Sequence, residues 1–245
     1  MHLLLYCIFH RSSGRPTDGL RGVDLQPILE ITNDGLSAAV SEVRRLPALQ
    51  EVPQILIYES VISALHKKHS LIPMRFGCLL DGPSTVMGLL CERHADFLKT
   101  ISEISDCEEM GIHILLEKHP GCGGPPAEPA VSRCSPASVS PADGRAYLAS
   151  RRRHYDSISK EELEHQTLLE RVCSDLTGLF ERCRVDEHKS HIPLLPVNMR
   201  LVSFRFLVHR TLLGDFRAAA ERSLSRMDER WFLGEPSPPF SFVSA

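Results

Sequence analysis

Two pairs of histidines have the spacing of neighbouring metal ligands. His66 and His69 lie three residues apart at the end of an expected helix, and His188 and His191 repeat that spacing near an expected strand. Imidazole nitrogens are common ligands of zinc and other transition metals. The sequence places no carboxylate or third ligand beside either pair. We therefore interpret these side chains as solvated surface histidines and expect no metal site.

Glu162 and His165 form a single Glu-x-x-His motif. Di-iron helix bundles use this motif twice, together with two further glutamates on facing helices. Because the chain holds one copy on a strongly charged helical segment, we interpret the match as coincidental.

A basic cluster covers residues 151–154, with the sequence Arg-Arg-Arg-His. Such a cluster could bind a phosphate group or an acidic partner. It could instead be the solvated or salt-bridged face of a helix, with the cations near the helix end. The residues themselves leave both interpretations open.

No sequence motif identifies an enzyme. The chain has no phosphate-binding loop, nucleophile elbow, zinc-protease helix or dinucleotide-binding glycine pattern. Catalytic triads are assembled in space, so this does not exclude catalysis. An enzyme or small-molecule-binding module therefore stays as an alternative, with His66, His69, His113 and Glu109 as the first residues to examine. We expect no enzyme activity and no cofactor.

The overall composition is that of an average soluble globular protein. The chain has 245 residues, 42% hydrophobic and 24% charged, with a net charge of −3 and 6% aromatic residues. A net negative charge and few aromatic side chains disfavour nucleic-acid binding. The apolar start at residues 3–9 is too short to span a membrane, which takes about 20 residues, and has no basic segment before it, so we expect neither a signal peptide nor a membrane partner.

The cysteines indicate the cellular compartment of the protein, and the proline-rich centre indicates its domain organisation. The eight cysteines include no Cys-x-x-Cys pair, which is typical of free thiols in a reducing compartment, so we expect a cytoplasmic protein. Prolines, glycines and serines dominate residues 120–143, which read as a linker. We therefore predict domains at 1–119 and 144–245.

The N-terminal half shows alternating strand and helix patterns. We expect strands at 3–9, 22–31 (with Pro27 at an edge or bulge), 36–43, 71–76 and 112–116, and helices at 52–69 and 84–104. The Asn33-Asp34-Gly35 turn predicts a hairpin of the second and third strands. This order indicates an α+β sheet with helices on one face and with residues 112–116 as its closing strand.

The C-terminal half is expected to combine helices with a small mixed sheet. Helices are predicted at 143–154, 157–183 and 211–227, and strands at 199–210, 231–233 and 240–243. Residues 199–210 alternate most clearly, with Phe204 and Phe206 on one face. The strand, helix and strand that end the chain are typical of a crossover unit. No repeat of residues relates the two halves.

Several segments in order resemble the GvpL/GvpF family of gas vesicle proteins. They are Leu-Leu-Tyr-Cys-Ile at 4–8, Leu-Ile-Pro-Met-Arg-Phe-Gly at 71–77, Glu-Met-Gly-Ile-His-Ile at 109–114, Gly-Arg-Ala-Tyr-Leu-Ala-Ser-Arg-Arg at 144–152 and Pro-Pro-Phe-Ser-Phe-Val at 238–243. The resemblance spans nearly the whole chain. It implies a two-domain protein whose N-terminal domain is ferredoxin-like.

The resemblance also implies a function in gas vesicle formation. Members are accessory or minor structural components that contact the small, hydrophobic major shell protein, and they act with other gas vesicle accessory proteins. We therefore expect a cytoplasmic protein associated with gas vesicles that helps the shell to assemble, without catalysis. The candidate partner-binding residues are Arg75, Phe76, Tyr147, Arg151, Phe204, Phe206, Phe240 and Phe242. Packing within the fold is the alternative role for these positions.

Overall fold

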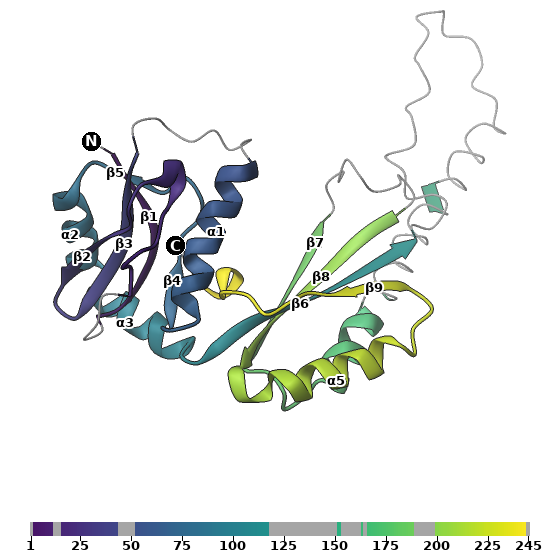
Figure 1. The fold of residues 1–245 in the computed structure, drawn as a ribbon. Coiled ribbons are helices and arrows are strands. Elements are labelled where there is room, and N and C mark those ends of the chain that lie inside the picture. Colours follow the sequence, from purple (N-terminus) through teal and green to yellow (C-terminus); the bar gives the residue numbers. More distant parts are fainter. Residues whose placement is uncertain are drawn as a thin grey trace, which may run out of the picture.

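The computed structural model describes residues 2–11, 16–43, 52–117, 151–152, 163, 166–188 and 199–243. The predicted linker at 120–143 and the predicted helix at 143–154 fall largely outside these ranges. The described strands form two antiparallel sheets that lie side by side in Figure 1. The α+β class expected from the sequence is confirmed. None of the described helices is both long enough and apolar enough to cross a membrane.

The first sheet is built around a strand that is buried on both faces. β1 lies at its centre, in the order β2-β3-β1-β4, and a further strand, β5, also pairs with β1. The five strands are β1 (His2–His10), β2 (Leu29–Asn33), β3 (Leu36–Val43), β4 (Leu71–Pro73) and β5 (Leu79–Leu80). The predicted hairpin of β2 and β3 is confirmed, with both Asp34 and Gly35 at positive φ, as a tight hairpin turn requires.

Helices cover both faces of this sheet, which corrects the expectation of helices on one face. α1 (Val52–His66) packs against the face that contains Leu4, Tyr6 and Phe9. α2 (Pro83–Glu92) and α3 (His94–Glu103) cover the opposite face. A strand that is apolar along its whole length has two apolar faces, and each must be shielded from water.

Two predicted elements of the first half are interrupted. The helix expected at 84–104 is divided at Arg93, whose ψ of 20° leaves the helical region. The strand expected at 22–31 begins instead with the 3-10 turn η1 (Val23–Leu25), followed by β2 from Leu29. Here Gly22 lies against the Tyr6 hydroxyl, which accepts a hydrogen bond from the Val23 amide. A Cβ at position 22 would collide with that hydroxyl, so only glycine fits this close approach.

The second sheet contains the strand that the sequence assigned to the first. β6 (Cys107–Glu117), which includes the predicted strand 112–116, pairs along its whole length with β8 (Met199–His209). β7 (Arg182–His188) and β9 (Arg230–Leu233) complete the order β7-β8-β6-β9. The sheet is antiparallel rather than mixed. Alternation of side chains identified the strand, but it carries no information about which sheet receives it.

The long helix expected at 157–183 ends early. Residues 166–175 are helical, Gly178 adopts a φ of 84°, and Cys183 already belongs to β7. A glycine at positive φ is a common end to a helix, because it allows the left-handed turn that satisfies the last carbonyls. Helix 166–175 and α5 (Leu213–Leu224) both contribute to the core on one face of the second sheet.

The two sheets share one topology although no residue repeat was found. In each, the strands follow the order second, third, first, fourth. The second sheet has the complete β-α-β-β-α-β succession of a ferredoxin-like fold, with α5 as the predicted crossover between β8 and β9. The first sheet has the same strand order, with α1 between β3 and β4 and η1 where the other helix would stand.

The chain end returns to the junction of the two sheets (Figure 1). The strand expected at 240–243 is instead the 3-10 turn η3 (Phe240–Phe242). Pro238 and Pro239 immediately before it cannot donate backbone hydrogen bonds to a sheet. Phe242 enters the core cluster of the first sheet, together with Cys107 of β6 and Leu207 of β8. That cluster therefore joins both sheets.

Candidate functional site

The two phenylalanines that alternation selected as a partner surface lie in the core. Phe204 and Phe206 are fully buried on the helix-covered face of the second sheet. The Phe206 ring centroid is 5.2 Å from that of Phe216 on α5 and 5.0 Å from that of Phe180. These are the contacts of packing residues, and neither side chain lies on the protein surface.

The aromatic residues of the chain end are also occupied within the fold. Phe242 is 4% exposed, and the guanidinium carbons of Arg182 and Arg184 lie 5.5 and 5.7 Å from its ring centroid. Phe240 is partly buried and packs against the core on the α1 side of the first sheet. Both residues hold the end of the chain in place.

The remaining predicted partner-binding residues do not gather in one place. Arg75 is exposed, and Phe76 is half-buried with its ring edge against Tyr58, at a centroid distance of 5.2 Å. Arg151 is exposed in a helical segment. Tyr147 lies outside the described residues, as do Glu162 and His165. The role of these positions in binding a partner remains a prediction.

The candidate metal-binding histidines of the first pair have separate surroundings. His66 is buried rather than solvated, and its Nε2 lies 3.1 Å from Glu108 Oε2. The His69 ring stacks on Phe9 at 5.5 Å, and desolvation, with a smaller effect of Lys68, lowers the pKa of this imidazole. Within the described residues, no three His, Cys, Asp or Glu side chains converge as metal ligands would. His191 lies outside those residues.

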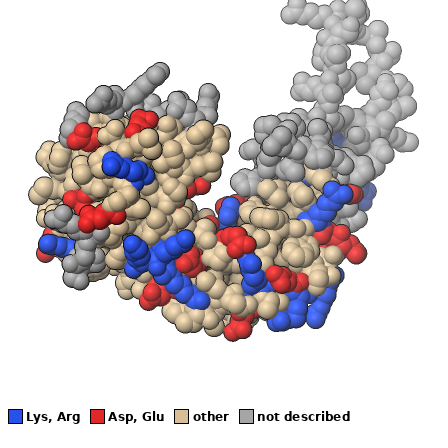
Figure 2. All heavy atoms as spheres, in the orientation of Figure 1, with Lys and Arg blue, Asp and Glu red and all other residues tan. Residues whose placement is uncertain are grey.

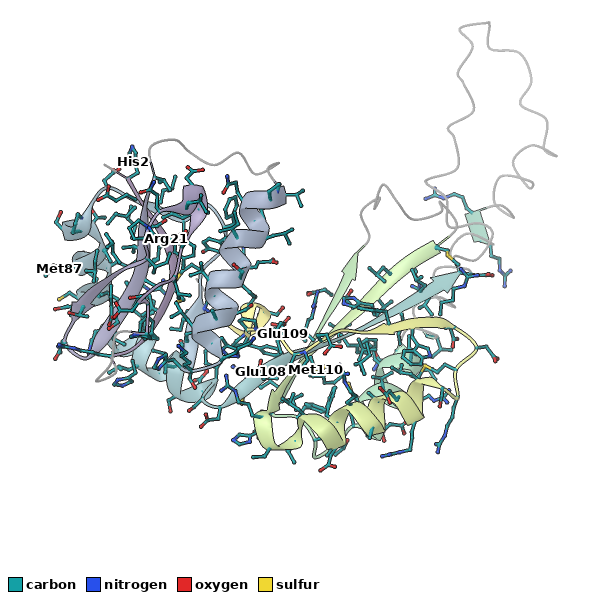
Figure 3. All side chains as sticks on the ribbon, in the orientation of Figure 1. His2, Arg21, Met87, Glu108, Glu109 and Met110 are labelled. Atoms are coloured by element: carbon teal, nitrogen blue, oxygen red, sulfur yellow. The ribbon has the colours of Figure 1, made fainter. Side chains whose placement is uncertain are left out.

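The half-buried carboxylate of Glu108 connects the two sheets at the start of β6. Glu108 also forms an ion pair with Arg210, whose Nε lies 3.1 Å from Oε1, and Arg210 Nη2 donates a hydrogen bond to the His66 carbonyl at 2.5 Å. These contacts join β6 and the residue after β8 to the end of α1. Figure 3 shows Glu108 and Glu109 at the start of β6, between the two sheets. An opposite charge beside it offsets part of the cost of removing the Glu108 carboxylate from water.

Glu109 fastens the chain end to the same strand. Its carboxylate accepts hydrogen bonds from the Ser241 amide and the Ser241 hydroxyl, each at 2.8 Å. Arg205 Nη1 lies 3.6 Å from the same carboxylate. Glu109 therefore has a positioning role at the junction. Another residue considered for chemistry, His113, lies farther along β6 and contacts Ser203 Oγ through Nδ1 at 2.8 Å.

Replacing Glu109 with glutamine is expected to loosen the chain end. The amide retains one acceptor oxygen, so one of the two Ser241 groups loses its partner, at a cost of about 1–3 kcal/mol. Hydrogen exchange of the Ser241 amide should accelerate correspondingly. Glu117→Gln, at the exposed end of the same strand, is the matched control. Equal Ser241 protection in both variants would contradict the role of Glu109.

An exposed aromatic edge lies at the other side of the second sheet. β9 is the last strand of this sheet and, among the described strands, pairs only with β6. Trp231 is 37% exposed and Phe232 is 64% exposed, on opposite faces of the strand. The Phe232 ring stacks on His113 at a centroid distance of 6.1 Å. An open edge and large exposed aromatic side chains are the features that another chain can pair with.

A pocket of about 760 Å³ adjoins this edge. Helix 166–175 and the ends of β6 and β8 line it, and Arg230 belongs both to the pocket and to β9. Its lining combines apolar and charged side chains and comprises Leu115, Leu116, Glu117, Leu163, Thr167, Leu168, Arg171, Met199, Arg200, Met227, Asp228, Glu229 and Arg230. Figure 2 shows both signs of charge interspersed over the second sheet and its helices, without a single-sign field. We call β9 together with this pocket the β9 region.

The sequence itself carries a signal for the β9 region. The strand predicted at 231–233 includes Trp231 and Phe232, which are not among the predicted partner-binding residues. Adjacent tryptophan and phenylalanine in one short strand must point to opposite faces. In a two-layer unit with helices on one face, at least one of the two is then directed away from the helices.

A family model described as "Gas vesicle synthesis protein GvpL/GvpF" matches residues 2–244. The structure is similar to that of GvpF from Anabaena sp. PCC7120, with a TM-score of 0.67, 19% sequence identity, and coverage of 100% of this chain and 96% of that chain. It is also similar to GvpF from Microcystis aeruginosa, with a TM-score of 0.71, 16% identity, and coverage of 100% and 99%. At these identities the likeness supports the fold alone. No curated protein sequence matches the chain.

Proposed function

The chain belongs to the gas vesicle synthesis protein GvpL/GvpF family, and from this membership we propose that it binds the major shell protein and assists assembly of the shell. The match over residues 2–244 is the observation that carries the proposal, because it includes both sheets and the returning chain end. That the protein is associated with gas vesicles follows directly from the family. Contact with the shell subunit is the further step.

The tendency of exposed apolar surfaces to aggregate supports a role in binding the shell protein. A subunit that forms a shell with an apolar face exposes that face before it is incorporated, and large exposed apolar surfaces aggregate. A protein that covers such a surface transiently keeps the subunit available for assembly. We propose that this chain acts in that way in the cytoplasm and at the growing vesicle, together with other accessory proteins, and without catalysing a reaction.

We assign the contact to the β9 region. Among the described residues, β9 combines a strand edge without a neighbour with two exposed aromatic side chains. An extended segment of a partner can add to such an edge through backbone hydrogen bonds, while its side chains enter neighbouring apolar pockets. The adjoining pocket includes apolar side chains, among them Leu115, Leu168 and Met199, that would contact them.

Replacing Phe232 with aspartate is expected to reduce co-purification of the shell protein at least about tenfold. A central aromatic contact contributes roughly 2 kcal/mol or more, and each 1.4 kcal/mol corresponds to a factor of about ten in affinity. The tagged chain would be co-expressed with the shell protein from the same source, and the soluble complex quantified after purification. Because Phe232 is 64% exposed, the variant should fold normally.

Leu29→Asp is the matched control. Leu29 is an apolar residue of an edge strand and is 42% exposed, but it belongs to β2 of the first sheet. It should leave co-purification unchanged. If the unmodified chain does not bind the shell protein, the proposed function fails. If the unmodified chain binds and Phe232→Asp binds equally well, the assignment to the β9 region fails while the function stands.

A further inference from the structure

Two cysteines, one in helix 166–175 and one in the second sheet, have their sulfur atoms in contact. Cys173 lies in helix 166–175 and Cys183 lies in β7, and their Sγ atoms are 4.0 Å apart. Both residues are free thiols, and both are half-buried. The pair therefore lies close enough to react internally while remaining within reach of a small reagent.

We propose that Cys173 and Cys183 form a thiol oxidation site, at which a peroxide-class oxidant converts the pair into a disulfide. One thiolate attacks the peroxide, so that an S–O bond forms, the O–O bond breaks and the first water leaves after protonation. The second sulfur then attacks the sulfenic sulfur, so that the S–S bond forms, the S–O bond breaks and a second water leaves. Two thiols are oxidised, and one peroxide is reduced to two waters.

The surrounding chain allows the sulfurs to meet. A disulfide requires an S–S distance of about 2.05 Å, so the two atoms must approach from their present 4.0 Å. Cys173 lies near the end of its helix, and β7 is an outer strand of its sheet. Short shifts at a helix end and at a sheet edge disturb fewer neighbours than shifts within a core.

Burial disfavours the thiolate form of Cys183. Desolvation by burial, with a contribution from Cys173, raises the pKa of the Cys183 thiol to about 12. Thiolates rather than thiols attack peroxides, so oxidation through Cys183 should accelerate as the pH rises above neutral. Cys91 is exposed and is not in contact with another described thiol. Cys91 therefore serves as an internal reference for the oxidation of a single exposed thiol.

The bond would fix the helix that lines the pocket of the β9 region. Thr167, Leu168 and Arg171 of helix 166–175 form one wall of that pocket. Joining Cys173 to Cys183 attaches this helix covalently to β7, and the pocket wall becomes less free to move. The oxidation site is independent of whether the shell protein binds.

The test uses hydrogen peroxide on the purified full-length chain. After exposure, free thiols are alkylated, the protein is digested without reduction, and peptides are identified by mass spectrometry. We expect a linked peptide joining Cys173 to Cys183 that lacks two hydrogen atoms relative to the separate peptides. Its yield should rise with pH. Cys173→Ser and Cys183→Ser should each abolish it, whereas Cys91→Ser should leave it unchanged.

Oxidation of Cys91 in the same sample shows that the oxidant was active. If Cys91 is oxidised while Cys173 and Cys183 are recovered as separately alkylated peptides, the proposal is overturned. A link from Cys173 or Cys183 to Cys122 or Cys134, which lie outside the described residues, would overturn it as well. Should one serine variant fail to fold, the peptide map of the unmodified chain decides between these outcomes.

Discussion

Replacing Phe206 with alanine is expected to lower the free energy of unfolding by about 3–5 kcal/mol. The side chain is fully buried, and the rings of Phe180, Phe204 and Phe216 surround it. Truncation removes apolar area from the core and leaves a cavity that helices and sheet cannot fully close. Urea unfolding, followed by circular dichroism, would measure the loss as a lower midpoint at a similar slope.

Phe232→Ala is the matched control for this experiment. It removes the same side chain from the same sheet, but at a position that is 64% exposed, so its effect should stay within about 0.5 kcal/mol. The two variants also separate packing from recognition. Phe206→Ala should act on stability, whereas changes at Phe232 should act on shell-protein binding. Equal unfolding midpoints for the two variants would show that the second sheet is not packed as described.

Replacing Phe242 with alanine is expected to release the chain end and to destabilise the junction, again by about 3–5 kcal/mol. Phe242 belongs to the core cluster that also contains Cys107 of β6, Leu207 of β8 and residues of α2 and α3. Its removal also takes away the ring beneath Arg182 and Arg184. Limited proteolysis should then cleave the end of the chain faster, and urea should unfold the protein at a lower concentration.

Phe240→Ala is the control that shows whether truncating any aromatic residue near the chain end has the same effect on stability and cleavage. Phe240 lies two residues away and is only partly buried, so its truncation should cost clearly less. If Phe240→Ala is the more damaging variant, then Phe242 does not anchor the chain end. If Glu109→Gln and Phe242→Ala accelerate cleavage at the same site, the carboxylate and the ring hold the same segment.

The junction explains why the end of the chain has a structural role. The returning segment supplies Phe242 to the core of the first sheet and Ser241 to Glu109 of the second. Glu108, His66 and Arg210 add a second set of contacts between the sheets. The relative placement of the two sheets therefore depends on side chains from the middle and from the end of the sequence.

The sequence by itself determined the elements whose pattern is local. The uninterrupted apolar run became the central strand β1, the Asn33-Asp34-Gly35 turn joined β2 to β3, and the alternation at 199–210 became β8. These features depend on backbone preferences and side-chain periods within a few residues, which any tertiary arrangement must respect. The α+β class was confirmed, as was the family resemblance, which rested on the segments at 4–8, 71–77, 109–114, 144–152 and 238–243.

Only the tertiary structure decided which strands pair with each other and which apolar residues remain outside the core. β6 joined the second sheet, and the chain end formed η3 against the first. Phe206 and Phe232 are the same residue type in strands of one sheet, yet one is fully buried and the other exposed. A period of two separates the faces of a strand, but burial depends on what packs against each face, and that is set by segments distant in the sequence.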